Sequence, residues 1–184
     1  MSESLFEKTV KTENSFLAGG FNFKLVSSTE RHVRYESNEV YVEYYFENGR
    51  GYEIDFWIGK LDSERSYSSD QIQDFFNSNI TEVLGKSATT DELVRKIVSH
   101  LSTILKKDAP KLLTGDKEIF NELQKFNQQK ILEYSIETNL RQARNKAETA
   151  WHNKDYKIVV EALEPLSTYL SESEKTKLEY CKKQ

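Results

Sequence analysis

The chain lacks most of the features that mark secreted and membrane proteins. Its 184 residues contain one cysteine, Cys181, so no disulfide can form within the chain and a reducing compartment is expected. No apolar run approaches the length that crosses a bilayer. The opening residues, MSESLFEKTVKTE, carry acids where a signal peptide needs basic and then apolar residues. We therefore expect a cytoplasmic protein with no membrane partner.

The sequence also lacks an excess of basic charge, and it lacks phosphate-binding loops. The formal net charge is −4 and the isoelectric point is near 5.6, which disfavours nucleic acid as a partner and suits a basic protein. The sequence has none of the glycine-rich loops that bind phosphates or build oxyanion holes. Cys181 lies three residues from the end, where fraying holds a nucleophile poorly. The sequence therefore predicts no cofactor and no cysteine catalysis.

Aromatic residues, in contrast, are plentiful, and many lie in the segment VYVEYYFENGRGYEIDFWIG at residues 40–59. Its even positions are all apolar or aromatic: Val40, Val42, Tyr44, Phe46, Tyr52, Ile54, Phe56 and Ile58. Side chains alternate across a strand, so this pattern predicts a hairpin with one buried face. The segments FNFKLV at 21–26 and HVRYES at 32–37 alternate in the same way. We expect a four-stranded antiparallel meander.

Loop lengths determine the expected register of this meander. The shortest loops that keep every core row on one face give three facing pairs: Leu25 with Val33, Tyr35 with Val40, and Glu43 with Asp55. Like charges that face each other across two strands repel. The Glu43–Asp55 pair is therefore expected to need a cation, supplied by a partner, by a metal or by the chain itself.

Helical periodicity is expected on both sides of the strands. The apolar spacing predicts helices over three early segments: 4–17, 68–76 and 89–107. A long helix follows from about residue 116, and its apolar stripe falters at 127–130, where we expect a kink or a restart. The expected fold is thus α+β, a four-stranded antiparallel meander flanked by helices in residues 1–110. A mostly helical region, 111–184, is expected to pack on it.

The segment ARNKAETAWHNKDYKIVVEAL resembles one tetratricopeptide-like helical hairpin. The resemblance rests on small and apolar residues at the repeat spacing: Ala143, Ala147, Ala150, Val159 and Leu163. One hairpin falls short of the roughly three repeats that a solenoid needs, so it is expected to pack on the rest of the chain. As an alternative function, the resemblance implies an adaptor that binds a peptide in a groove beside Trp151 and Tyr156.

The front of the chain also resembles a known class. The order of elements runs from FLAGGFNFKLV through HVRYESNEVYVEYYFENGRGYEIDFWIG to DELVRKIVSHLSTIL and PKLLTGD. It is similar to small bacterial α+β proteins, some of which look like immunity proteins that neutralise the toxins of neighbouring cells. This resemblance implies a non-enzymatic protein that binds and blocks a toxin domain, and it transfers no catalytic residues.

The outward positions of the hairpin form the candidate binding surface. They are acidic or aromatic where a solvated face usually has Lys, Thr and Ser: Tyr41, Glu43, Tyr45, Glu53, Asp55 and Trp57. Tyr and Trp are enriched at interface hot spots, and the acids suit a basic partner. Two other arrangements stay open. Lys24, His32 and Arg34 neutralise the acids within the chain, or the C-terminal helices cover the face.

A third hypothesis is a small enzyme that uses His32 with Glu43 and Asp55. A histidine beside carboxylates can act as a general base. No motif places a nucleophile beside these residues, and zinc requires two or more His or Cys ligands. The other histidines, His100 and His152, lie on different expected elements. We therefore expect no metal and no catalytic residues.

Overall fold

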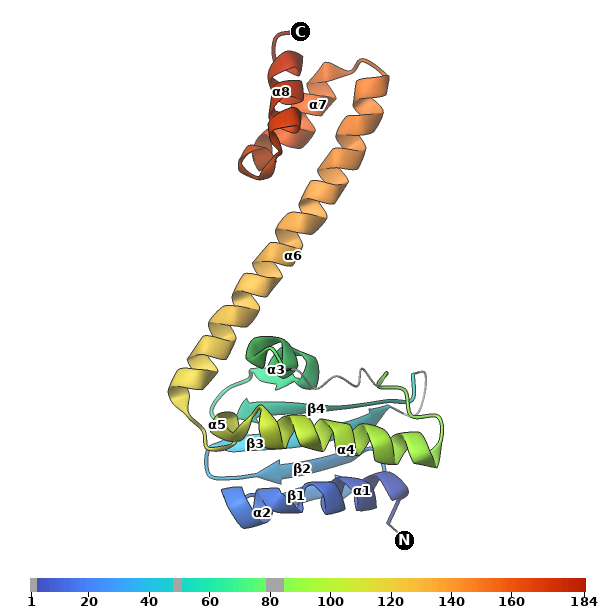
Figure 1. The fold of residues 1–184 in the computed structure, drawn as a ribbon, viewed down its shortest axis with the longest axis vertical. Coiled ribbons are helices and arrows are strands. Elements are labelled where there is room, and N and C mark those ends of the chain that lie inside the picture. Colours follow the sequence, from blue (N-terminus) through green and yellow to red (C-terminus); the bar gives the residue numbers. More distant parts are fainter. Residues whose placement is uncertain (1–2, 48–50, 79–84) are drawn as a thin grey trace. The chain divides into compact units, whose positions relative to one another are not determined.

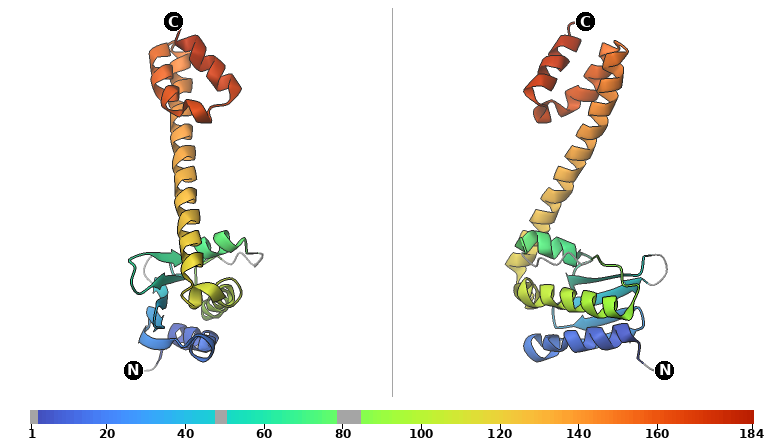
Figure 2. Two further views of the ribbon diagram at one scale, coloured as in Figure 1. Left: turned by 90° about the vertical axis from the view of Figure 1, so that its left-hand side faces the viewer. Right: turned by 45° about the vertical axis from the view of Figure 1, so that its right-hand side comes forward.

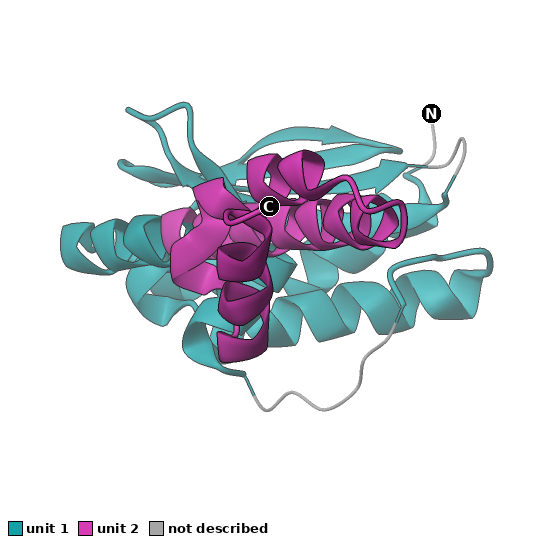
Figure 3. Ribbon diagram, turned by 90° about the horizontal axis from the view of Figure 1, so that it is seen from above, with its two compact units in different colours: residues 1–127 teal, residues 128–184 magenta. Residues whose placement is uncertain are grey.

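The computed structural model describes residues 3–47, 51–78 and 85–184 of the chain. The chain divides into two compact units, residues 1–127 and 128–184 (Figure 3). Helix α6 (Lys117–His152) contributes residues to both units. Each unit is described by itself below.

Unit 1 contains an antiparallel sheet whose strands neighbour each other in chain order (Figure 1). The strands are β1 (Lys24–Thr29), β2 (His32–Glu36), β3 (Val40–Glu47), β4 (Glu53–Lys60) and β5 (Ser66–Ser68). The α+β class and the antiparallel meander are confirmed, but the expected count of four strands is wrong. β5 lies in a segment for which no strand was expected, and its buried Tyr67 faces Ile58 of β4.

The expected register is wrong by two residues in each of the hairpins. The observed pairs are Leu25 with Tyr35, Tyr35 with Val42, and Glu43 with Trp57. The turn between β2 and β3 is centred one residue later than a Tyr35–Val40 pair requires, because the N–H of Ser37 donates to the carbonyl of Val40 at 2.8 Å and leaves Asn38 and Glu39 between them. A shift of two residues keeps every side chain on its face. Tyr44 and Ile54 are therefore both buried, as expected.

Two residues that were expected in the core are exposed. Leu25 is 45% exposed because the register shifts between Leu25 and Ser27, at a β-bulge in the edge strand β1. Tyr52 is 45% exposed and has a φ of 52°, so it precedes β4 in a left-handed conformation rather than extending the strand inward.

Two helices, α1 (Leu5–Glu13) and α4 (Asp91–Lys107), lie side by side over one face of the sheet (Figure 2). α1 starts with a capping box, in which Ser4 accepts from the N–H of Glu7. α4 starts at Thr90, which accepts from the N–H of Leu93, one residue later than the spacing of Thr89 and Glu92 suggested. The apolar stripe of α4 packs on the inward side chains of the sheet to form the core of unit 1.

The first helical segment is broken in two. α1 ends before Asn14, and α2 (Ser15–Phe21) follows it, so the glycines at 19 and 20 lie inside α2 rather than after the helix. Asn14 is fully buried and satisfies its side chain at both ends. Its Nδ2 donates to the carbonyl of Val10 at 2.9 Å, and its Oδ1 accepts from the hydroxyl of Tyr44 at 3.0 Å. This break ties the helices to the middle of the sheet.

Residues beyond 110 complete the core of unit 1. α5 (Pro110–Leu113) buries Leu112 and Leu113, and the first turns of α6 bury Phe120 and Leu123. α3 (Ser69–Phe76) follows β5 directly and is capped by Ser68. The segment 111–127 therefore belongs to the sheet-containing unit in the structure.

Unit 2 is helical, as expected for the C-terminal part. It comprises the rest of α6 with α7 (Tyr156–Leu163), the 3-10 helix η1 (Glu164–Tyr169) and α8 (Glu172–Cys181). α6 runs without a break through 127–130, so the expected kink is absent from this helix. The residues that define the expected hairpin are all buried in one cluster: Ala143, Ala147, Ala150, Val159 and Leu163. Across the described residues, no helix has the length and apolar character needed to span a membrane.

Candidate functional site

The face of the sheet opposite α1 and α4, here called the outer face, gathers all six predicted site residues. On β3 and β4 its side chains are Tyr41, Glu43, Tyr45, Glu47, Glu53, Asp55 and Trp57, with Gly59 at the end of the row. The observed register puts Tyr45 opposite Asp55 and Glu43 opposite Trp57. The expected facing of Glu43 and Asp55, and of Tyr45 and Glu53, is therefore wrong.

Arg34 of β2 contacts three neighbours on this face, Tyr41, Glu36 and Glu43. Its guanidinium lies 4.0 Å from the centroid of the Tyr41 ring. Its Nε donates to Glu36 and its NH1 group donates to Glu43, both at 2.8 Å. Burial lowers the pKa of Arg34, but the hydrogen bonds to Glu36 and Glu43 outweigh this and raise it overall. Arg34 is thus a fixed positive charge inside the surface.

Tyr41 lies beneath Arg34 and is only 9% exposed. Its ring passes over Gly59 of the neighbouring strand, where a Cβ atom would approach the Tyr41 Cζ to 2.7 Å. Glycine is needed at position 59 because any side chain would displace this ring. Tyr41 therefore supports the surface and offers little area to a partner.

Glu43 is neutralised within the chain. Besides Arg34, it contacts the Nε2 of His32 at 3.4 Å, and its side chain is 13% exposed. Burial, and then the charge of Glu43, raise the pKa of the neighbouring Tyr45 hydroxyl. Two of the three basic residues considered from the sequence, His32 and Arg34, do contact this acid, while Lys24 faces Glu36 across the β1–β2 pair.

Asp55 is neutralised by a residue that the sequence did not indicate. Its carboxylate accepts from Lys86 Nζ, from Ser69 Oγ and, at 2.8 Å, from the N–H of Phe56. Lys86 also bonds Asp70 at 2.7 Å, and these hydrogen bonds raise the pKa of Lys86 against the opposing effect of burial. Asp55 therefore fastens the start of α3 to β4. Lys86 is 31 residues away in sequence, so no local spacing points to the contact.

Tyr45, Glu47, Glu53 and Trp57 form the other end of the outer face, here called the open end. Tyr45 is 41% exposed and meets Trp57 edge-on, with ring centroids 5.5 Å apart. His32 stacks against Tyr45 at 4.6 Å. Glu47 and Glu53 face each other, and both are exposed. An opposed pair of acids therefore exists, four residues along β3 from Glu43 and two residues along β4 from Asp55.

The enzyme hypothesis needs His32, Glu43 and Asp55 in one cluster. His32 and Glu43 are in contact, but Asp55 bonds α3 and Lys86. The three histidines lie on three different elements: His32 on β2, His100 on α4 and His152 on α6. Within residues 3–47, 51–78 and 85–184, no three His, Cys, Asp or Glu side chains are grouped to hold a metal ion.

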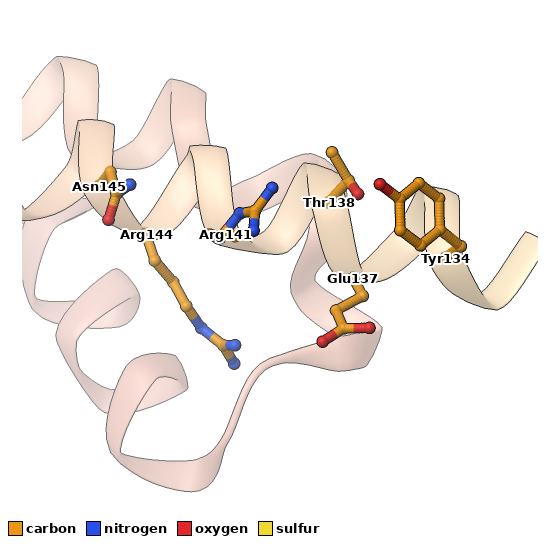
Figure 4. A pocket seen from close by; sticks show the side chains of 6 residues that line it. All are labelled: Tyr134, Glu137, Thr138, Arg141, Arg144 and Asn145. Atoms are coloured by element: carbon orange, nitrogen blue, oxygen red, sulfur yellow. The ribbon is translucent and has the colours of Figure 1, made fainter. Parts of the chain in front are cut away.

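Unit 2 carries a second surface feature that the sequence did not indicate. A depression of about 350 Å³ is lined by Tyr134, Glu137, Thr138, Arg141, Arg144 and Asn145 (Figure 4). All six side chains come from α6, so the depression is shallow, because one helix cannot enclose a cavity. Arg144 bonds both carboxylate oxygens of Glu174 at 2.6 and 3.1 Å, which lowers the pKa of Glu174 to about 2.

The groove expected beside Trp151 and Tyr156 is filled by other side chains. The rings of Trp151, Tyr156 and Tyr180 contact one another edge-on, with centroids 5.7–5.8 Å apart. Lys177 lies 4.5 Å over the Trp151 ring. These aromatic residues pack on one another in unit 2.

Comparison with known proteins finds no matching family model, no matching curated protein and no matching solved structure.

Proposed function

We propose that this chain is a non-enzymatic cytoplasmic binding protein that occludes a basic partner protein with the outer face of its sheet, in the manner of a toxin-immunity protein. The observation that carries the proposal is the exposed Tyr45 beside Trp57, bordered by Glu47 and Glu53. Tyrosine and tryptophan bury large areas at low entropic cost, which is why they recur at interface hot spots.

The surface around these aromatic residues is held in place before any partner arrives. Tyr45 packs against His32 and Trp57, and His32 in turn contacts Glu43. Arg34 fixes Glu43 from the other side. A surface with few side chains left to order loses less entropy on association, so more of the contact energy appears as affinity.

Charge supports a basic partner. Glu43 and Asp55 are already matched by cations of this chain, so the charge available to a partner is that of Glu47 and Glu53. Opposite charges across an interface mainly accelerate encounter and select the partner. Glu43 and Asp55 therefore shape the surface, while Glu47 and Glu53 attract the partner.

The proposal is tested with the product of the gene immediately upstream, the expected place of a cognate toxin gene. Size-exclusion chromatography of the two purified proteins should show a complex, and the chain should block the activity of that product. A Tyr45→Ser variant should weaken the complex, whereas Tyr134→Ser, at a more exposed tyrosine on α6, should not. Complex formation that depends on Tyr134 alone would place the interface on unit 2.

A second candidate function, an adaptor, is favoured by one observation on unit 2. Ile131, Leu132 and Tyr134 of α6 are 67%, 59% and 71% exposed. Exposed apolar side chains close together on one helix are typical of surfaces that bind another chain. Tyr134 also borders the depression that contains Arg141 and Arg144. The Tyr134→Ser arm of the experiment above distinguishes this adaptor from the outer-face binder.

A further inference from the structure

Strand β3 carries the same short pattern twice on its outer face. The sequence YVEYYFE places Tyr41 and Glu43, and then Tyr45 and Glu47, each pair separated by one inward-facing residue. Side chains two apart on a strand lie on one face. The strand therefore presents two successive tyrosine–glutamate units to the same side of the sheet.

The first unit already holds a guanidinium group. Arg34 lies over the Tyr41 ring and bonds Glu43, and a second carboxylate from the neighbouring strand, that of Glu36, completes the site. A planar guanidinium donates along fixed directions, so it suits two carboxylates and an aromatic ring better than an ammonium group does. The protein thus contains an occupied example of this chemistry.

The second unit has the same parts, although His32 already packs against its tyrosine ring. Tyr45 supplies the ring, Glu47 supplies the carboxylate of β3, and Glu53 of the neighbouring strand faces Glu47. Tyr45, Glu47 and Glu53 are all exposed. Facing residues place their Cβ atoms about 5 Å apart, close enough for one cation to contact both carboxylates and relieve their repulsion.

The geometry points to Tyr45, Glu47 and Glu53 as a site for the guanidinium group of an arginine that the partner protein presents. Trp57, in contact with Tyr45, provides further aromatic surface for the arginine side chain. This inference rests on the proposed function, because it names the group by which the partner is recognised. The inferred site also accounts for the difference between the two tyrosine–glutamate units. The first binds an arginine of the chain itself, and the second would bind an arginine of the partner.

The site can be probed without the partner. Trp57 and Trp151 are the two tryptophans, so Trp151→Phe leaves Trp57 as the fluorescent reporter beside the site. The full-length variant is titrated with N-acetyl-arginine amide and, separately, with N-acetyl-lysine amide, which carry the same charge. The arginine compound should change Trp57 emission saturably at a several-fold lower concentration than the lysine compound.

Matched variants locate the response. Glu47→Gln and Glu53→Gln should each weaken the arginine response roughly fivefold, because each removes one charged hydrogen-bond acceptor. Glu64→Gln changes the net charge equally at an exposed position outside the sheet and should leave the response unchanged. Calorimetric titration of the unmodified chain gives the same comparison without a tryptophan replacement.

The outcomes separate this site from the proposed function. Equal responses to the two compounds, no saturable response, or a response that survives Glu47→Gln and Glu53→Gln would overturn the arginine site, even if the upstream product binds. Selective arginine binding together with no complex would support the site and overturn the proposed partner.

Discussion

Gly59 is the residue on which the arrangement of the outer face depends most directly. Its missing side chain leaves room for the Tyr41 ring, and that ring supports Arg34. A Cβ atom at position 59 would also come within 2.8 Å of the Arg65 carbonyl oxygen, which belongs to the backbone and cannot rotate away.

Gly59→Ala should therefore destabilise unit 1. We expect a loss of about 1–3 kcal/mol in the free energy of unfolding, typical of overpacking. Urea denaturation measures it. Gly19→Ala is the matched control, because nothing lies within 4 Å of a Cβ atom there and alanine favours a helix. Equal stability of Gly59→Ala and the parent would show that Tyr41 does not occupy this position.

Glu174 gives unit 2 a defined pH dependence. Arg144 and the cap hydrogen bonds of Ser171 hold the pKa of Glu174 at about 2 in the folded chain, below its ordinary value of 4.5. A lowered folded-state pKa means that the charged form stabilises the fold above about pH 4.5, and that this contribution disappears as the pH falls toward 2.

Glu174→Gln should remove this contribution while keeping the capping box, because glutamine can also accept at that position. At pH 7 we expect a loss of about 1 kcal/mol, as for an ion pair at the surface. The difference between the two proteins should shrink as the pH is lowered from 5 to 3. Unfolding free energies at several pH values measure it, and a difference that stays constant with pH would contradict the role given to the charge.

At the scale of elements, side-chain alternation predicted the faces of the strands correctly, whereas loop length predicted the pairing between strands incorrectly. The alternation on β3 and β4 placed all six candidate residues on one face, because a strand has a fixed period of two. Pairing across strands depends on loops, and the turn at Ser37–Val40 shifted it by two residues. The β3–β4 pairing also differs by two residues from the one expected, so Glu43 does not face Asp55 and the opposed acids are Glu47 and Glu53.

Helix α6 shows why its periodicity faltered. Phe120 and Leu123 are buried in unit 1, while Ala143, Ala147 and Ala150 are buried in unit 2. At 3.6 residues per turn these two sets do not continue one stripe, so the pattern breaks between them although the helix does not. When a continuous helix buries one side in its first part and another side in its second part, its apolar pattern is interrupted. In the sequence, this interruption resembles the pattern of a kinked helix.

Ala147 allows α6 to approach its neighbours in unit 2. It is 3% exposed and shares its cluster with Val159 and Leu163 of α7. Ala147→Leu should overpack this contact and lower the free energy of unfolding by about 1–3 kcal/mol. Lys146→Leu, at an exposed position one residue away, should cost far less. An unchanged urea midpoint for Ala147→Leu would show that the helices do not pack closely there.

At the scale of the whole molecule, the fold class and the helical C-terminal part were predictable because they depend on periodicity. The ion pair between Asp55 and Lys86 was not predictable, because it joins residues far apart in sequence. That contact also changes which substitutions test binding. Replacing Asp55 would release α3, whereas Glu53 and Trp57 can be replaced with less disturbance of the sheet.

The central claim is that a basic partner docks on the open end of the outer face. The most direct measurement is the kinetics of the complex with the upstream gene product, by surface plasmon resonance at several salt concentrations. Trp57→Ala should speed dissociation roughly 30-fold, equivalent to about 2 kcal/mol. Glu53→Lys should slow association and make its rate less sensitive to salt. Trp151→Phe, in unit 2, should match the parent, and circular dichroism should confirm that all variants remain folded. Parent-like kinetics for both folded outer-face variants would contradict the account and place the interface elsewhere.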